Sequence, residues 1–179
     1  MKNPWKKLSS KNIYENAWIK IREDAVVNPS GGDGIYGVVS FKNIAVGVLP
    51  LDEDGFTYLV GQYRYPLDAY SWEIPEGGCP QGEEPLEAGK RELLEETGIK
   101  AENWEELLTI HTSNSVCDEV GYVFIARQLS FYEAQPESTE DLKVKKIHLS
   151  EAVEMVMRNE IRDSISVAAL LKAKILLDV

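Results

Sequence analysis

The pattern of apolar and polar residues divides the chain into a β-rich first part and a second part in which helices and strands mix. Short runs rich in β-branched residues, some alternating with polar residues, are typical of strands. Clusters of Asn, Pro, Ser, Gly and Asp separate these runs and predict turns, so we expect antiparallel hairpins. The expected strands are 17–27, 35–41, 44–49 and 56–65, followed by a short extended piece at 72–75.

A helical period begins at Glu84 and continues to Thr97. Three leucines recur within this segment at the spacing of one helix face. Pro85 suits the first helical turn and Gly98 suits the C-terminal cap. The sequence therefore predicts a helix over 84–97.

The last third of the chain predicts three more strands, at 104–111, 121–129 and 142–149, and then two helices. Ser150 and Asp163 are residue types that favour an N-cap, so we expect the two helices to begin there. This order predicts an α+β fold with a mixed β-sheet between helices (α/β/α) and an N-terminal antiparallel β extension. With 179 residues, 44% of them hydrophobic, the chain suffices for a single domain, 1–179.

The charge balance restricts the possible partners. The chain has 30 acidic and 19 basic residues and a formal net charge of −11, which argues against binding DNA or RNA. A pyrophosphate ligand would be repelled by this field unless bound cations reversed its sign locally. Two histidines and two isolated cysteines leave carboxylates to carry any acid–base chemistry. The sequence has no run of about 18 apolar residues and no apolar leader, so we expect a cytoplasmic protein with no membrane contact.

Glu95 and Glu96 of the predicted helix follow Glu92 by three and four residues, so the three side chains should cluster on one side of the helix. Their repulsion would weaken an isolated helix by a few tenths of a kcal/mol per pair, roughly. Arg91 can pair with Glu95 or Glu83, and a hard divalent cation, Mg²⁺ or Mn²⁺, can neutralise the rest. On spacing alone, an ordinary solvated acidic face with one salt bridge is the alternative.

The segment around this helix resembles the Nudix box, Gly-x5-Glu-x7-Arg-Glu-U-x-Glu-Glu-x-Gly-U, in which U is apolar. Leu93 and Ile99 fill the two apolar positions. Gly77, Gly78 and Gly82, which precede the helix, predict a loop whose backbone is free to wrap closely around a ligand. A pattern of this length at fixed spacing is far more specific than a lone glycine motif, and it requires such a loop followed by the predicted helix. The chain is therefore identified as a member of the Nudix hydrolases. The fixed positions of the box are matched by Gly77, Glu83, Arg91, Glu92, Glu95, Glu96 and Gly98.

Two further stretches, 62–66 and 71–78, resemble the ADP-ribose pyrophosphatase and nucleoside diphosphate sugar hydrolase branch. That branch commonly has alanine where this chain has Glu76, a departure that leaves a backbone carbonyl for metal but changes the pocket wall. The resemblance implies Mg²⁺-dependent hydrolysis of a nucleoside diphosphate sugar, such as ADP-ribose or GDP-mannose, to a nucleoside monophosphate and a sugar phosphate. The alternatives are a nucleoside triphosphate pyrophosphohydrolase and a nucleotide-sensing module that does not cleave.

The resemblance also implies roles for the box residues. Glu92 and Glu96 would be the principal metal ligands, with Glu95 as a further ligand or a water-mediated partner and the carbonyl of Glu76 assisting. Arg91 would orient Glu95 and the structural residue Glu83, and Gly98 would end the helix.

A late acidic loop is expected to supply the general base, because a loop glutamate has this role in the resembling branch. Glu140 aligns best with the base of that branch, and Glu137 is the alternative. The non-functional interpretation is that these residues form an ordinary solvated acidic loop.

Substrate contacts are expected from Arg64, which can pair with a phosphate or the terminal sugar, and from the backbone at Gly77. Trp18 and Tyr14 are candidates to stack on the base, although each is as readily a core residue. In the resembling enzymes the N-terminal strands cross between two subunits. Residues 1–43 are therefore expected to form a β arm that dimerises the protein, and a homodimer with a nucleotide-sugar substrate is the expected assembly.

Overall fold

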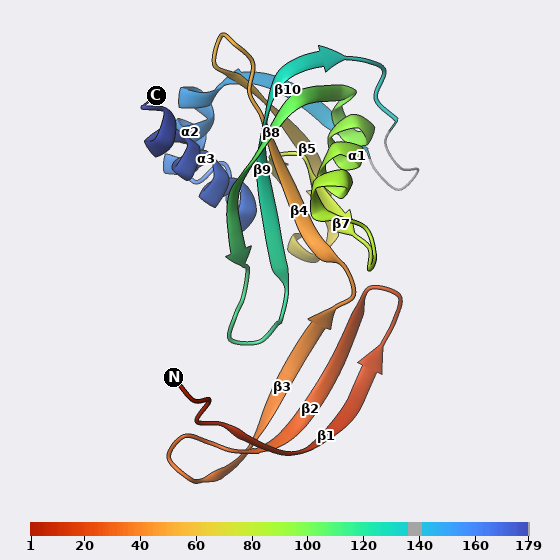
Figure 1. The fold of residues 1–179 in the computed structure, drawn as a ribbon, viewed down its shortest axis with the longest axis vertical. Helices are drawn as coiled ribbons and strands as arrows, with labels where there is room; N and C mark the ends of the chain where they lie inside the picture. The colour runs from red at the N-terminus through yellow and green to blue at the C-terminus, as the bar shows by residue number, and fades with distance from the viewer. Residues whose placement is uncertain (136–140, 179) are drawn as a thin grey trace.

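The computed structural model describes residues 1–135 and 141–178, in which three β-sheets and three α-helices are arranged as Figure 1 shows. The N-terminal strands form a sheet of their own, and the other strands form two sheets between the helices. The N-terminal sheet has the order β1-β2-β3, with β1 (Lys6–Glu15), β2 (Ile19–Val27) and β3 (Asp33–Phe41).

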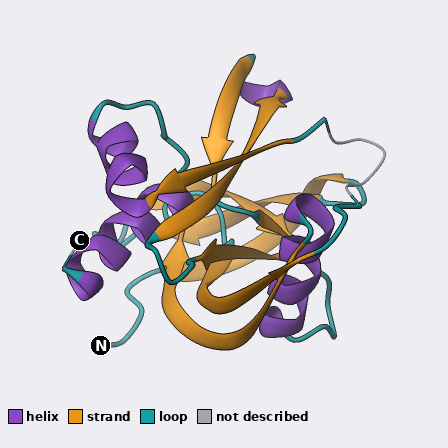
Figure 2. Cartoon of the chain, turned by 90° about the horizontal axis from the view of Figure 1, so that it is seen from above, coloured by secondary structure: helices purple, strands orange, loops and turns teal. Residues whose placement is uncertain are grey.

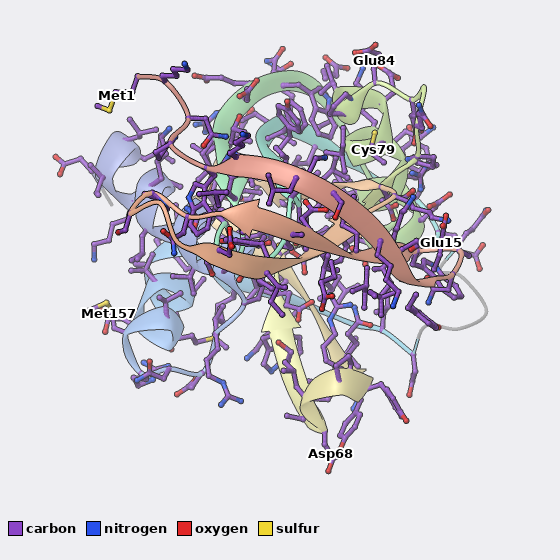
Figure 3. The ribbon with its side chains drawn as sticks, turned by 90° about the horizontal axis from the view of Figure 1, so that it is seen from below. Met1, Glu15, Asp68, Cys79, Glu84 and Met157 are labelled. Carbon is purple, nitrogen blue, oxygen red and sulfur yellow. The ribbon has the colours of Figure 1, made fainter. Side chains whose placement is uncertain are left out.

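The central sheet has four strands in the order β7-β4-β9-β8, namely β7 (Glu76–Cys79), β4 (Ile44–Pro50), β9 (Val120–Phe131) and β8 (Ile99–His111). The pair β4–β9 is parallel and the other pairs are antiparallel, so the sheet is mixed. A third, antiparallel sheet has the order β10-β5-β6, with β10 (Lys143–His148), β5 (Phe56–Arg64) and β6 (Ala69–Glu73). A 3-10 turn (Tyr65–Leu67) closes the hairpin between β5 and β6, and its tip at Asp68 projects from the molecule (Figure 3).

Helices cover both sides of these two sheets, as Figure 2 shows: α1 (Pro85–Thr97) lies on one side, and α2 (Leu149–Met157) and α3 (Ser164–Leu177) on the other. On the α1 side, Leu93 is fully buried against Val48 and Tyr58 of the sheets. On the opposite side, the apolar residues of α2 and α3 form a larger core with the inner faces of both sheets. The predicted α/β/α arrangement is therefore confirmed.

Hydrogen bonds fix the N-terminal sheet to the β8–β9 connection. The Val39 amide donates to the carbonyl of Val116 (2.9 Å), and Ser40 Oγ donates to Asp118 Oδ2 (2.7 Å). Every residue of β1 is exposed, because β1 is the outer strand and, among the described residues, pairs with β2 alone. The sheet is attached to the β8–β9 connection by β3 and also by an ion pair from Arg22 of β2 to Asp118 (4.0 Å).

Several predicted boundaries were wrong. The strand at 6–15 was not predicted, because its polar residues hide the alternation, and β8 begins at Ile99 instead of residue 104. The extended piece predicted at 72–75 is the end of β6, which begins at Ala69 and stops at Glu73. Strands β3 and β4 follow one another but belong to different sheets, so no hairpin joins them.

Two predictions of local structure were also wrong. The glycine stretch expected to be loop is partly strand, because Gly77 and Gly78 pair with β4. The helix expected to begin with Ser150 as N-cap begins at Leu149 instead, because the His148 side chain accepts the hydrogen bond of the Ser150 amide (3.3 Å). Asp163 is the N-cap of α3, as predicted, and its side chain accepts from the Ser166 amide (2.7 Å).

Candidate active site

Helix α1 is held in one orientation by its ends and its buried face. Pro85 occupies its first turn, and Gly98, at φ +70°, ends it in the left-handed conformation. Ala88 and Leu93 are fully buried against the sheets, which fixes the rotation of the helix about its axis. The glutamates of the box consequently lie toward β7.

Arg91 connects the acidic residues of this region. Its guanidinium donates to Glu83 (3.0 Å), Glu92 (2.8 Å) and Glu95 (3.1 Å), and also to the Gly78 carbonyl (2.9 Å). The hydrogen bond to Glu83 and the nearby Glu92 and Glu95 raise the pKa of Arg91 above its ordinary value. Arg91 thus joins the loop, β7 and the helix through hydrogen bonds, and it contacts both Glu83 and Glu95, the two residues that it was expected to orient. The orienting role itself stays a prediction.

Glu92 and Glu96 contact the backbone of β7. The Glu96 side chain is 2% exposed, and its Oε2 accepts a hydrogen bond from the Glu76 amide at 3.0 Å. The Glu92 carboxylate lies so close to Gly77 that a Cβ atom at that position would clash with it. Glycine is therefore required at position 77 because a carboxylate occupies the space beside its backbone.

A cavity of about 470 Å³ is lined by Glu76 and Gly77 of β7, and no carboxylate of α1 is among its lining residues. Strands β4, β5, β6 and β7, the β8–β9 connection and the start of α3 contribute to its wall. Its polar and charged lining residues are Arg64, Ser71, Glu73, Glu76, Thr112, Glu119, Arg162, Asp163 and Ser164, and Gly77 lies among them.

Arg64 and two carboxylates form the charged centre of this cavity. Arg64 Nε donates to both oxygens of Glu73 at 3.0 Å, and its Nη2 donates to Glu73 and, at 3.1 Å, to Glu76 Oε1. Burial would lower the pKa of Arg64, but the hydrogen bonds and charge of Glu73 and the charge of Glu76 raise it above its ordinary value. Burial, together with the neighbouring Asp163 and Glu73, raises the pKa of Glu76 well above the usual range of a glutamate.

The donor set of α1 and β7 fits a hard divalent cation. Glu96 is a nearly buried carboxylate, and such a group is costly unless positive charge compensates it. Glu92 and Glu95 add carboxylate oxygens of the kind that Mg²⁺ and Mn²⁺ prefer. In residues 1–135 and 141–178, however, no three acidic, histidine or cysteine side chains are already gathered as a metal cage.

The structure brings some predicted residues together and leaves others apart. Arg64, Glu76 and Gly77 line the same cavity, and the carboxylate of the box residue Glu92 lies against Gly77. Trp18 is 70% exposed and Tyr14 is 52% exposed, and neither lines the cavity within one chain. The two predicted base residues, Glu137 and Glu140, lie outside the described residues.

Sequence reasoning missed three acidic residues of the cavity: Glu73, Glu119 and Asp163. Glu73 lies in a stretch that suggested the family, but nothing in its spacing revealed the contact with Arg64. Glu119 accepts a hydrogen bond from Thr112 Oγ1 at 2.5 Å, and both residues come from the β8–β9 connection. Asp163 was predicted only as an N-cap, and the position of α3 against the sheet is what brings it to the cavity.

Residues 41–167 match the NUDIX domain, and residues 5–39 match the nucleoside diphosphate sugar hydrolase N-terminal domain. Together with the complete box on α1, these matches define the chain as a hydrolase of phosphoanhydrides. The chain belongs to the NUDIX family and is a Nudix pyrophosphatase.

Curated relatives extend over nearly the whole chain. ADP-ribose pyrophosphatase of Bacillus subtilis (strain 168) is 32% identical over 161 residues, which cover 89% of this chain and 86% of the relative. ADP-ribose pyrophosphatase of Mycobacterium tuberculosis (strain ATCC 25618 / H37Rv) is 33% identical over 168 residues, or 92% of this chain and 80% of the relative. The methanol dehydrogenase activator of Bacillus methanolicus is 32% identical over 166 residues, which cover 92% of this chain and 89% of the relative.

The crystal structure of an ADP compounds hydrolase has a TM-score of 0.87 to this chain at 19% identity. The superposition covers 97% of this chain and 94% of the chain in that structure. At this identity the likeness establishes the fold. Among the helices of the described residues, none combines the length and apolar character needed to span a membrane.

Proposed function

We propose that this protein hydrolyses the pyrophosphate bond of a nucleoside diphosphate sugar to a nucleoside monophosphate and a sugar phosphate. ADP-ribose is the first substrate to test and GDP-mannose the second. The observation that carries the proposal is the position of Gly77: its backbone lies against the Glu92 carboxylate and also lines the 470 Å³ cavity. A diphosphate at this strand can lie beside the carboxylates while the group attached to it enters the cavity. The names of the two ADP-ribose pyrophosphatase relatives support this substrate class.

The proposed cofactor is Mg²⁺, with Mn²⁺ as a substitute. Glu92 and Glu96 would hold it, with Glu95 and the Glu76 carbonyl assisting. When bound, the metal neutralises pyrophosphate charge and lowers the pKa of a water molecule. Arg91 keeps the carboxylates of α1 in place through its contacts with Glu83 and Gly78.

The proposed general base is Glu140, with Glu137 as the alternative. Its carboxylate would take the proton of the attacking water, which makes the water a better nucleophile toward phosphorus. This assignment rests on the resemblance of the loop, since both glutamates lie outside the described residues.

The proposed assembly is a homodimer in which the N-terminal arm, residues 1–43, of one subunit contributes to the site of the other. The arm exposes several large apolar side chains, including Trp18 and Ile35 at 70% and 71%. Exposed apolar groups of this size are typical of an interaction surface. In this arrangement Trp18, which does not reach the cavity of its own chain, would stack on the base of a nucleotide bound to the partner.

A substrate panel tests the proposal. The full-length protein with Mg²⁺ is incubated separately with ADP-ribose, GDP-mannose, dinucleotides and nucleoside triphosphates, and the phosphate-bearing products are identified by mass. We expect a nucleoside monophosphate and a sugar phosphate from a nucleotide sugar. Pyrophosphate release from triphosphates alone would support the pyrophosphohydrolase alternative, and binding without any product would support a sensing module.

A further inference from the structure

Strand β3 holds the connection between β8 and β9, residues 112–119, of its own chain (Figure 1). The Val39 amide donates to the carbonyl of Val116 at 2.9 Å, and the Asp118 amide donates to the carbonyl of Val39 at 3.2 Å. These two bonds attach the backbone of the connection to β3 on both sides of Cys117. The function proposed above gives this attachment no role.

The side chain of Asp118 adds a second set of bonds to the same strand. Its Oδ2 accepts from Ser40 Oγ at 2.7 Å, and its Oδ1 accepts from the Phe41 amide at 3.2 Å. Ser40 Oγ in turn accepts from Arg22 of β2 at 2.9 Å, so two strands of the N-terminal sheet take part. Both oxygens of the carboxylate are therefore held by that sheet, which fixes the orientation of Asp118.

The residue that follows Asp118 lines the cavity. Glu119 lies between Asp118, which is bound to β3, and Val120, at which β9 begins. Its Oε2 accepts a hydrogen bond from Thr112 Oγ1 at 2.5 Å. Its Oε1 has no hydrogen-bond partner among the described residues and is not buried, so it is available to a ligand. The attachment of Asp118 on one side and the strand on the other determine where Glu119 lies in the cavity wall.

The chemistry of Glu119 suits the substrate end that is expected in this cavity. In the proposed function the distal sugar of a nucleoside diphosphate sugar enters the cavity, and a carboxylate oxygen accepts hydrogen bonds from sugar hydroxyls. Such a bond is restricted in distance and angle, so a displacement of the acceptor by about 1 Å removes it. Binding of the sugar by Glu119 therefore requires that its backbone is held in place.

We propose that Asp118 is a positioning residue for substrate binding: its contacts with β3 keep the Glu119 carboxylate where it binds a hydroxyl of the distal sugar. The N-terminal sheet then supports the cavity of its own chain, in addition to the contribution proposed for it in the partner subunit. This inference rests on the proposed function, because it assumes that the sugar of the substrate enters the cavity.

The test is a double-mutant cycle between Asp118 and Glu119 in the full-length protein. kcat and KM for ADP-ribose are measured with Mg²⁺ for the wild type, Asp118→Ala, Glu119→Ala and the variant with both substitutions. Ser40→Ala removes the contact from the side of β3, and it is also combined with Glu119→Ala. Tyr36→Phe is the matched control, because it removes a hydrogen bond of 2.7 Å from β3 to the Ser115 carbonyl of the same connection and leaves Asp118 in place.

We expect Asp118→Ala to raise KM for ADP-ribose by about five- to tenfold, a factor typical of one hydrogen bond, and to leave kcat nearly unchanged. The lower end of this range is expected, because the Asp118 side chain is 51% exposed. Glu119→Ala should raise KM by at least the same factor. In the Glu119→Ala background, Asp118→Ala should change KM by less than about twofold, because the carboxylate that it positions is already absent.

The two remaining variants separate positioning from a general effect on the connection. Ser40→Ala should raise KM by a smaller factor than Asp118→Ala, since the Phe41 amide still binds Asp118. This effect should also disappear in the Glu119→Ala background. Tyr36→Phe should leave KM at the wild-type value.

Several results would overturn the inference. Wild-type KM in Asp118→Ala or in Glu119→Ala would do so, as would effects that multiply in the double variant or an equal rise of KM in Tyr36→Phe. If Asp118→Ala does not fold, the combination of Ser40→Ala with Glu119→Ala decides in the same way. In each case turnover of ADP-ribose by the wild type leaves the proposed function standing, whereas cleavage of triphosphates alone would refute that function and the inference with it.

Discussion

The substitution Glu96→Gln separates the contribution of the buried carboxylate to catalysis from its contribution to stability. Glutamine has the same shape, and its amide oxygen can still accept the hydrogen bond from the Glu76 amide. What changes is the charge of a side chain that is 2% exposed and lies one helical turn from Glu92. We expect opposite effects on activity and on the stability of the metal-free protein.

The magnitudes follow from the position of Glu96. Removing the i, i+4 charge repulsion between Glu96 and Glu92 should raise the free energy of unfolding by roughly a few tenths of a kcal/mol. Removing the desolvation of a buried carboxylate adds to this, so we expect a total gain of about 1 kcal/mol without metal. For a chain of this size that gain raises Tm by about 2–4 °C. Loss of a direct metal ligand should lower kcat/KM by more than about 100-fold, because even residues that support metal ligands from outside contribute 10–100-fold.

The assay is a thermal melt in chelator and again across a Mg²⁺ titration, combined with steady-state kinetics. Mg²⁺ at 100 times Kd should raise the free energy of unfolding of the wild type by about 2.7 kcal/mol and raise Tm with it, whereas Glu96→Gln should gain far less. Glu87→Gln is the matched control, since Glu87 is on the same helix but pairs with Lys90 at the surface. Near-normal turnover of Glu96→Gln at low Mg²⁺, or a lower Tm in chelator, would refute this reasoning.

Four further predictions concern other parts of the molecule. Activity should vanish in excess chelator and return with Mg²⁺ or Mn²⁺, whereas Ca²⁺ should support it poorly because its oxygen distances are longer; full turnover in chelator would contradict the metal requirement. Glu140→Gln should lower kcat by about 10² to 10⁴ with little change in substrate affinity, and a larger loss in Glu137→Gln would transfer the role of base to that residue. Sedimentation should show a dimer, and deletion of 17–40 should abolish dimerisation and nucleotide binding together; a fully active monomer would exclude a shared site. Gly98→Ala should destabilise the protein by about 2 kcal/mol, since it places a Cβ at φ +70° against the Tyr132 carbonyl, whereas Gly37→Ala, with open space around it, should not.

The box residues were predictable because the relevant contacts are local. Arg91 and Glu95 are one helical turn apart, and helix geometry alone brings them together. The end of α1 at Gly98 was likewise predictable, since few residues other than glycine adopt the required conformation. The family pattern added the function of these residues, which spacing alone left open.

Strand pairing was predicted less well. A hairpin was expected wherever two strands follow one another, but β3 and β4 separate into different sheets, and β4 instead pairs in parallel with β9 about 76 positions later in the chain. The strand β1 was missed because an outer strand that exposes every residue carries no alternation between buried and exposed positions.

By itself, the sequence determined the α/β/α class, a helix predicted at 84–97 and observed at Pro85–Thr97, the clustering of Glu92, Glu95 and Glu96 on one side of that helix, and the family. Each of these depends on residues within a few turns of one another or on a pattern of fixed spacing. Only the tertiary structure decided that Arg64 is bound by Glu73 and Glu76, that Glu119 and Asp163 line the same cavity, and that Trp18 does not. The cavity residues among these come from three separate parts of the chain, at 64–76, 119 and 163. Their geometry is fixed by how the helices and sheets pack on a shared core, which no local pattern of residues encodes.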